Sequence, residues 1–177
     1  TNNFFNCAEQ GSTIDSLVIQ LHDFMKKKIE DCICVFFITN PARYLYFENN
    51  KAKILRPTGD KSALTKFYFG EVQSDQLDYH KANISILALQ RMCQQKGYRD
   101  YYMEGWTNID WKYHGIDTTK FLPQSATEMF GAKTNSNTLE LTKFQDNEYI
   151  KPNKYNPNQR GHEVIAKNVH DVINKND

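Results

Sequence analysis

The sequence has almost no excess charge of either sign, no long apolar run and few cysteines. Its 177 residues carry 22 Lys and Arg against 21 Asp and Glu, so no strong field attracts nucleic acid or an anionic membrane. The longest apolar stretch, residues 32–39, falls far short of the roughly 18 residues that span a bilayer, and the polar start is unlike a signal peptide. These absences predict a soluble chain without nucleic acid or membrane as a partner. The length suits a single domain, residues 1–177.

Only four cysteines occur: Cys7, Cys32, Cys34 and Cys93. Cys32 and Cys34 share one face of a strand, but a Cys-x-Cys pair without a second pair is a poor zinc signal. Three of the four fall in segments that we predict to be buried, so reduced thiols in a reducing compartment are expected. We expect no metal or other cofactor.

Aromatic residues, by contrast, are abundant at 13% of the chain. Many fall in the segments 44–47, 67–69 and 98–113, which we interpret as loops. Aromatic loops often form a binding surface or subunit contact, and at least as often they fold back over the core. The sequence leaves both interpretations open.

The hydrophobic pattern alternates between strand and helix along the chain. The expected elements are strands over residues 3–8, 32–39 and 101–106, and helices over residues 13–29, 74–96, 125–130 and 158–173. The run at 32–39 is unbroken, β-branched and aromatic, which is typical of a central strand covered on both faces. Residues 42–72 look irregular, with a turn at 56–60.

This order of elements predicts an α/β fold, a three-layer sandwich with a mainly parallel sheet and helices on both faces. In such sheets, ligands meet the loops that leave the carboxyl ends of the strands. Four segments qualify as this rim: residues 9–13, 40–43, 106–110 and 151–158.

The rim segments also carry motifs. The run Asn153-Lys-Tyr-Asn156-Pro157-Asn158-Gln-Arg-Gly161-His162-Glu-Val-Ile165-Ala166 resembles Asp-x-x-His-Pro-Asn-x-x-Gly-His-x-x-Ile-Ala of the SGNH or GDSL-type hydrolases. The run Asn6-Cys-Ala8-Glu-Gln-Gly11-Ser12 resembles the second block of that family, Asn-x-Ala-x-x-Gly-Ser. The run Thr39-Asn40-Pro41-Ala42-Arg43 is similar to a third-block variant, Thr-x-Pro-x-Arg, of hydrolase-like proteins of phages and their hosts.

The resemblance implies an SGNH-hydrolase-like fold whose first strand is missing, so we expect the domain to be incomplete at its N-terminus. The Gly-Asp-Ser block that supplies the nucleophile has no counterpart, and Asn153 and Asn156 stand where the family has its Asp and His. An asparagine amide cannot take a proton from a serine hydroxyl near neutral pH, and it cannot stabilise an imidazolium. We therefore expect no catalytic residue.

Other residues are poor replacements for the missing base and nucleophile. A lone histidine at a helix start, such as His162, is usually structural. Ser12 precedes a helical pattern and is expected to be an N-cap rather than a nucleophile. Surface or packing roles are expected for the remaining histidines: His22, His80, His114 and His170.

What remains is a candidate binding cleft without catalytic residues. Its members are Gly11, Ser12, Asn40, Arg43, Asn153 and Asn156. The N–H of Gly11 and the amide of Asn40 could bind a carbonyl or a sugar hydroxyl, but such donors alone do not turn over an ester. Each polar side chain also has a plainer interpretation: Asn40 as a turn residue, Arg43 as the partner of a carboxylate rather than of an anionic ligand, and Asn156 as a partner of backbone groups.

Two functions follow from these observations. The first is a non-catalytic SGNH-hydrolase-like domain that acts as a binding or structural protein, for example in a phage virion, with protein partners and a carbohydrate or ester ligand. The alternative is a serine esterase or carbohydrate O-deacetylase whose nucleophile segment lies outside this chain. A flavodoxin-like or nucleotide-binding domain is disfavoured, because the first rim loop has one glycine and no phosphate-cradling pattern.

Overall fold

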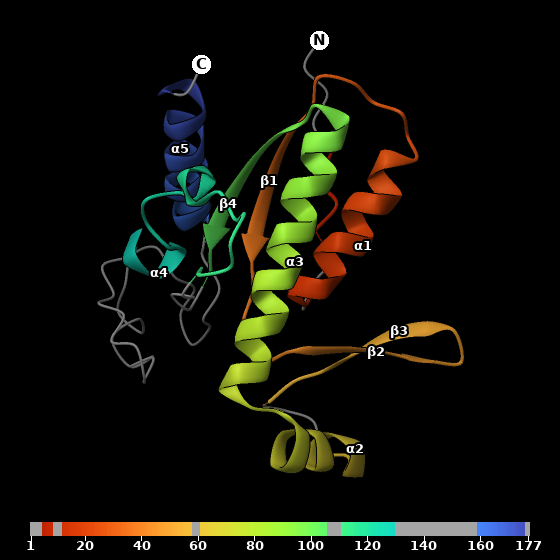
Figure 1. Ribbon diagram of the computed structural model, residues 1–177. Coiled ribbons are helices and arrows are strands. Elements are labelled where there is room, and N and C mark those ends of the chain that lie inside the picture. Colours follow the sequence, from red (N-terminus) through yellow and green to blue (C-terminus); the bar gives the residue numbers. More distant parts are fainter. Residues whose placement is uncertain (1–4, 9–11, 58–60, 106–110, 130–158, 176–177) are drawn as a thin grey trace.

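The computed structural model describes residues 5–8, 12–57, 61–105, 111–129 and 159–175. Within these ranges the chain is a mixed α/β protein with two small sheets (Figure 1). Its elements are α1 (Ile14–Met25), β1 (Ile33–Ile38), β2 (Tyr44–Glu48), β3 (Lys51–Leu55), α2 (Ala63–Phe67), η1 (Tyr68–Val72), α3 (Asp75–Lys96), β4 (Arg99–Glu104), η2 (Thr118–Lys120), α4 (Ala126–Met129) and α5 (Gln159–Lys175). The predicted α/β class is confirmed.

Strands β1 and β4 pair in parallel, from Ile33 opposite Arg99 to Ile38 opposite Glu104. The N–H of Gly105 extends this ladder by donating to the carbonyl of Ile38 at 2.9 Å. The long helix α3 lies between the two strands in the chain, as a parallel pair requires a crossover connection. The predicted parallel sheet is therefore present, although it has two strands in the described part of the chain.

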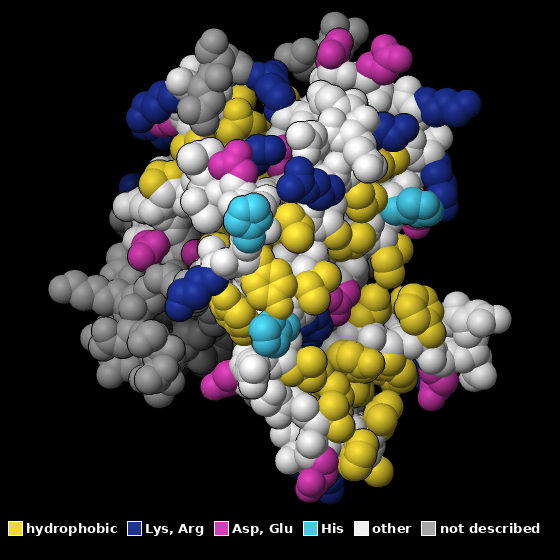
Figure 2. Space-filling view, viewed as in Figure 1, with side chains coloured by type: hydrophobic (Ala, Val, Ile, Leu, Met, Phe, Trp, Pro, Cys, Tyr) yellow, Lys and Arg dark blue, Asp and Glu magenta, His cyan; other side chains and the backbone are white. Residues whose placement is uncertain are grey.

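The second sheet is an antiparallel hairpin, β2 with β3, in the region that the sequence pattern suggested was irregular. The turn is formed by Asn49 and Asn50, whose φ values of 50° and 61° are both positive. Asparagine tolerates this conformation, and two such residues make the turn that matches the twist of a hairpin. The hairpin projects beside α2, away from the parallel sheet (Figure 1). Hydrophobic side chains are gathered on the surface in this region (Figure 2).

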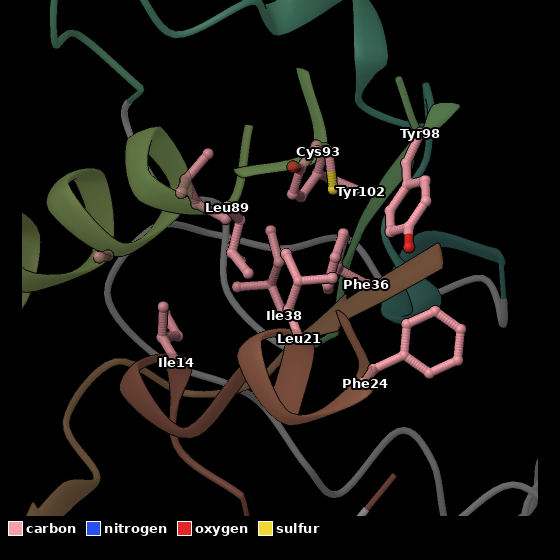
Figure 3. Packing of buried hydrophobic residues seen from close by; sticks show 11 residues of the cluster. Ile14, Leu21, Phe24, Phe36, Ile38, Leu89, Cys93, Tyr98 and Tyr102 are labelled. Atoms are coloured by element: carbon pink, nitrogen blue, oxygen red, sulfur yellow. The ribbon is translucent and has the colours of Figure 1, made fainter. Parts of the chain in front are cut away.

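The main core lies between the parallel sheet and two helices, α1 and α3. Figure 3 shows the side chains of Leu21, Ile38 and Leu89 converging from α1, β1 and α3. Tyr102 of β4 stacks on Phe36 with ring centroids 5.2 Å apart. A second cluster forms where α5 packs against Tyr101 and Met103, which point to the other side of β4.

One face of β1 is exposed, which contradicts the prediction of a strand covered on both faces. Ile33, Val35 and Phe37 are 38%, 45% and 41% exposed, whereas Phe36 and Ile38 are buried. The residues of α5 that pack against the sheet do so in the cluster with β4 residues. An unbroken apolar run therefore does not reveal that a neighbouring helix covers only one of two paired strands.

Helix α3 has the ends that its sequence predicts. The hydroxyl of Ser74 accepts a hydrogen bond from the N–H of Leu77 at 3.1 Å, and Gly97 ends the helix in the left-handed region at φ 68°. Helix α1 differs in two respects. It ends at Met25 rather than at residue 29, and its N-cap is Thr13, whose side chain forms a capping box with Ser16.

The remaining expectations are met in part. Residues 5–8 form no strand, and the side chain of Asn6 instead accepts a hydrogen bond from the N–H of Ala8 at 3.0 Å. The predicted helix at 125–130 is the single turn α4, with Ser125 before it. Helix α5 is present. The apolar residues expected to be buried on it are half-buried: Val164, Ile165, Val169, Val172 and Ile173.

Candidate functional site

Three of the six predicted cleft residues meet at the carboxyl end of β1. The guanidinium Nη1 of Arg43 donates to the carbonyl of Ser12 at 3.2 Å and to the hydroxyl of Thr39 at 2.7 Å. Arg43 thus ties the loop before α1 to the end of β1, where Asn40 follows. The other three predicted residues, Gly11, Asn153 and Asn156, lie outside the described residues.

Asn40 shapes the turn after β1. Its side-chain oxygen accepts from the N–H of Ala42 at 2.8 Å, and its carbonyl accepts from the N–H of Arg43 at 3.3 Å. This is the turn role that the sequence offered as one of two interpretations. The hydroxyl of Ser12 is not the N-cap of α1, and it accepts from the side-chain amide of Gln20 at 3.0 Å. A ligand-binding role for either residue stays a prediction.

Arg43 is half-buried, and it forms no ion pair with a carboxylate in the described ranges. Burial lowers the pKa of Arg43, and the nearby Arg56 lowers it further. No described carboxylate neutralises Arg43, so both interpretations of this residue, as the partner of a carboxylate or of an anionic ligand, stay predictions. An arginine side chain stays charged in proteins, so Arg43 places a positive charge at this half-buried position.

A polar cluster lies beside this rim, between the first turn of α1 and the first three turns of α3. Lys81 donates to the carbonyl of Arg43 at 2.8 Å and lies 3.6 Å from the carboxylate of Asp78. Ser85 donates its hydroxyl proton to Asp15 at 3.0 Å. Asp78, Lys81 and Ser85 recur at helical spacing, which is the one sequence signal that could have identified them. The cluster joins the rim to α3 and includes no histidine among its described partners.

Replacing Asp15 with asparagine is expected to change how stability depends on pH. Burial raises the pKa of Asp15, and Lys81 and the bond from Ser85 offset this only in part. The folded pKa exceeds the unfolded pKa, so the charged carboxylate costs stability at neutral pH, and this cost disappears as the pH falls through the folded pKa. Urea unfolding should show the wild type gaining stability relative to Asp15→Asn between about pH 7 and about pH 4. A difference that stays constant with pH would contradict this assignment.

Tyr68 carries a buried hydroxyl with no hydrogen-bond partner in the described part of the chain. Burial, with a smaller contribution from the nearby Asp78, raises the pKa of Tyr68 to about 12. Removing an unsatisfied polar group removes its desolvation cost, so Tyr68→Phe should leave the free energy of unfolding unchanged or raise it by up to about 1 kcal/mol. Tyr102→Phe is the matched control, because that buried hydroxyl donates to Asp100 at 2.7 Å. Its loss should cost about 2 kcal/mol in urea unfolding; equal losses for both variants would refute the distinction.

The histidines do not form a catalytic relay within the described ranges. No hydrogen bond between described residues joins a serine hydroxyl to a histidine: His80 pairs with Tyr113, and His170 with Asn174. His22 lies 3.4 Å from Asp23 on the surface. The other two histidines, His114 and His162, are exposed.

The four cysteines are free thiols. Cys93 is buried, Cys32 and Cys34 are half-buried, and Cys7 is exposed. We expected three buried thiols, and only Cys93 meets that expectation. A hydrogen bond with Cys93, together with burial, raises the pKa of Cys34, and burial raises the pKa of Cys32 to about 11. Both groups are therefore protonated thiols at neutral pH and poor nucleophiles.

The hairpin β2–β3 and the segment α2–η1 form a projection that we call the arm, residues 44–55 and 63–72. Tyr44 of the hairpin stacks on Tyr68 of η1 with ring centroids 4.4 Å apart, which joins the two halves. Phe47 and Phe67 are 63% and 60% exposed. Two aromatic segments of the sequence thus share one projection, and Figure 2 shows hydrophobic side chains gathered over it.

An open hollow of about 380 Å³ lies elsewhere, between α3 and the loop that leads to η2. The side-chain N–H of Gln90 donates to the carbonyl of Asp117 at 2.9 Å, and its side-chain oxygen accepts from the N–H of Asp117 at 2.8 Å. Lys120 is paired with Asp100, and Arg91 with Gln94. These side chains are already engaged with protein groups, so we assign no ligand to the hollow.

Comparison with protein-family models, with curated proteins and with solved structures gave no match. No group of His, Cys, Asp or Glu side chains is arranged to hold a metal ion within the ranges that the structure describes. Nor does any helix in those ranges combine the length and apolarity that crossing a membrane requires. What the chain does is therefore inferred from its own residues.

Proposed function

We propose that this chain is a non-catalytic domain that acts by binding, as a structural component of a protein assembly. The observation that carries the proposal is the arm, which holds large apolar side chains in water on a projection. The exposed large apolar side chains of the arm, which we call the patch, are Tyr44, Phe47, Leu64, Phe67 and Val72, with Leu77 at the start of α3. Tyr44 and Phe47 are three positions apart in β2, so they point to opposite faces of the hairpin. Exposed apolar patches on a soluble fold commonly mark interaction sites.

A second copy of the chain is the partner that fits this patch. The six side chains are between 37% and 63% exposed. With side-chain areas of roughly 150 to 200 Å² each, they offer roughly 500 Å² of apolar surface. Two copies that buried all of this surface against each other would bury at most roughly 1,000 Å², which is the lower limit for a specific interface. The arm therefore supports a dimer of modest affinity.

Charge also permits two copies to associate. The chain has 22 basic and 21 acidic residues, so long-range repulsion between copies is almost absent. On the arm itself, Glu48 and Lys53 form an ion pair with each other, so these two charges offset one another. The free energy of association would then come mainly from burying the apolar side chains of the patch.

The proposal also draws on the resemblance of the sequence to SGNH-type hydrolases. Asn153 and Asn156 replace the acid and the base of that family, which supports binding without turnover. The β1–β4 pair would belong to a three-layer sandwich, and the rim around Ser12 and Arg43 would hold a carbohydrate or ester. The setting we propose is a virion, because the segment 39–43 resembles a phage variant.

The double variant Phe47→Ser/Phe67→Ser is expected to weaken self-association at least about 30-fold, because central aromatic residues usually supply most of the affinity of an interface. Sedimentation equilibrium of the wild type and the variant measures this change. Ile19→Ser is the control, since Ile19 is 41% exposed on α1 and outside the patch. A wild type that stays monomeric at millimolar concentration, or a control that weakens association equally, would contradict the proposal.

The absence of catalysis has its own test. We expect the purified chain to leave short-chain aryl acetates unhydrolysed above the rate in buffer. Turnover that a serine-directed organophosphate abolishes would refute the non-catalytic assignment and would favour the alternative, a serine esterase or carbohydrate O-deacetylase.

A further inference from the structure

The base of the arm brings two arginines together. The paired residues of the hairpin run from Tyr44 opposite Leu55, at the base, to Glu48 opposite Lys51, next to the turn. Continuing this register by one residue toward the body places Arg43 opposite Arg56. Residues directly opposite each other share a face, with Cβ atoms roughly 5 Å apart. The hairpin therefore directs two guanidinium groups into the same region.

Nothing in the described chain neutralises this pair. Like charges directly opposite each other destabilise a hairpin. Neither Arg43 nor Arg56 forms an ion pair with a described carboxylate. Arg43 is half-buried, so water screens its charge less well than at the surface. The lowered pKa of Arg43, due to burial and then to Arg56, agrees with their proximity.

Both side chains keep donors for a ligand. Arg43 uses Nη1 for Ser12 and Thr39, which fixes the orientation of its guanidinium and leaves its Nε and Nη2 donors. Arg56 is exposed. The planar fork of a guanidinium matches two oxygen atoms of a phosphate or carboxylate group.

We propose that Arg43 and Arg56 form a binding site for an oxyanion, the phosphoryl or carboxylate group of a ligand, which bridges the two guanidinium groups at the base of the arm. The bound anion removes the repulsion across the hairpin and supplies the counter-charge that half-buried Arg43 lacks. Because Arg43 also belongs to the rim of the proposed function, this site names a chemical group that the ligand of that rim carries. It is independent of the apolar patch, since neither arginine belongs to the patch.

Thermal unfolding tests the site with inorganic phosphate and with acetate as probes, each titrated against chloride at constant ionic strength. Phosphate or acetate at about ten times its dissociation constant should raise the Tm of the wild type by about 3 to 5 °C. Arg56→Gln should abolish this shift, and Arg91→Gln, an arginine on α3 outside the site, should retain it. A shift with phosphate alone identifies a phosphoryl ligand, and a shift with both identifies oxyanions in general. No shift beyond that of chloride, or an equal loss in Arg91→Gln, would overturn the proposal.

A second measurement separates the site from a general fall in stability. In chloride at low ionic strength, Arg56→Gln should have a Tm about 1 to 2 °C above that of the wild type, because it removes the opposed charge. A lower Tm combined with a retained phosphate shift would refute the site. The variant Phe47→Ser/Phe67→Ser should keep the phosphate shift, so failure of the proposed dimer and failure of this site are distinguishable.

Discussion

Replacing Lys120 with methionine is expected to lower the free energy of unfolding by about 3 kcal/mol at neutral pH. Lys120 lies 2.7 Å from the carboxylate of Asp100, whose side chain is only 1% exposed. Without the ammonium group, the described partner left to this carboxylate is the hydroxyl of Tyr102. A buried charge that loses its partner costs far more than a surface pair, although water reaches part of the site because the Lys120 side chain is 31% exposed.

Urea unfolding of Lys120→Met and of a matched control measures this effect. The control is Lys26→Met, which breaks the ion pair with Asp23, where both side chains are more than half exposed. That change should leave stability within experimental error of the wild type. Adding Asp100→Asn to Lys120→Met should restore part of the loss, because the buried charge is then absent. Equal stability of the two lysine variants would show that Asp100 is not buried as described.

Replacing Ile86 with alanine is expected to cost about 3 to 4 kcal/mol. Ile86 is 0% exposed in α3, at the centre of the cluster that α1, β1 and α3 share. Losing three carbon atoms there removes burial and leaves a cavity that the surrounding helices cannot close without moving.

Ile84→Ala is the control for this change. Ile84 belongs to the same helix two positions earlier, but it is 58% exposed, so its truncation should cost less than about 1 kcal/mol. Urea unfolding of both variants compares the same chemistry at a buried and an exposed site. Similar losses would mean that α3 does not face the sheet as described.

The parts of the fold that the sequence predicts are those set by local chemistry. The ends of helix α3 follow from the hydroxyl of Ser74 and from Gly97, which lie next to the helix. Its buried face was not predicted, because it mixes apolar residues with Asp78, Asn83, Ser85 and Gln90. The hairpin was missed because an Asn49-Asn50 turn is a weaker signal than Asn-Gly, although both asparagines adopt the required positive φ. The exposed face of β1 depends on where α5 packs, and a strand's own residues do not encode the position of a distant helix.

Some residues of the candidate site could likewise be predicted from the sequence, and others depend on contacts between distant segments. Ser12, Asn40 and Arg43 lie together as expected, although residues 5–8 before Ser12 do not form the strand from which that expectation was drawn. Arg56 was not identified, because only the hairpin register places it opposite Arg43. Asp78 was not identified either, although its spacing of three from Lys81 on a predicted helix was a signal that could have revealed the pair. The sequence pattern places these residues near one another, but it does not show which donor atoms remain unbonded for a ligand.

Photochemical cross-linking from the arm tests the central claim most directly. A photoreactive benzoylphenylalanine in place of Phe47, which is 63% exposed, would react with whatever surface lies against the arm. The account predicts a covalent dimer on irradiation, with cross-links to residues 44–55 or 63–77 of the second copy. Cross-links confined to other surfaces, or no dimer at concentrations at which the protein associates, would contradict it.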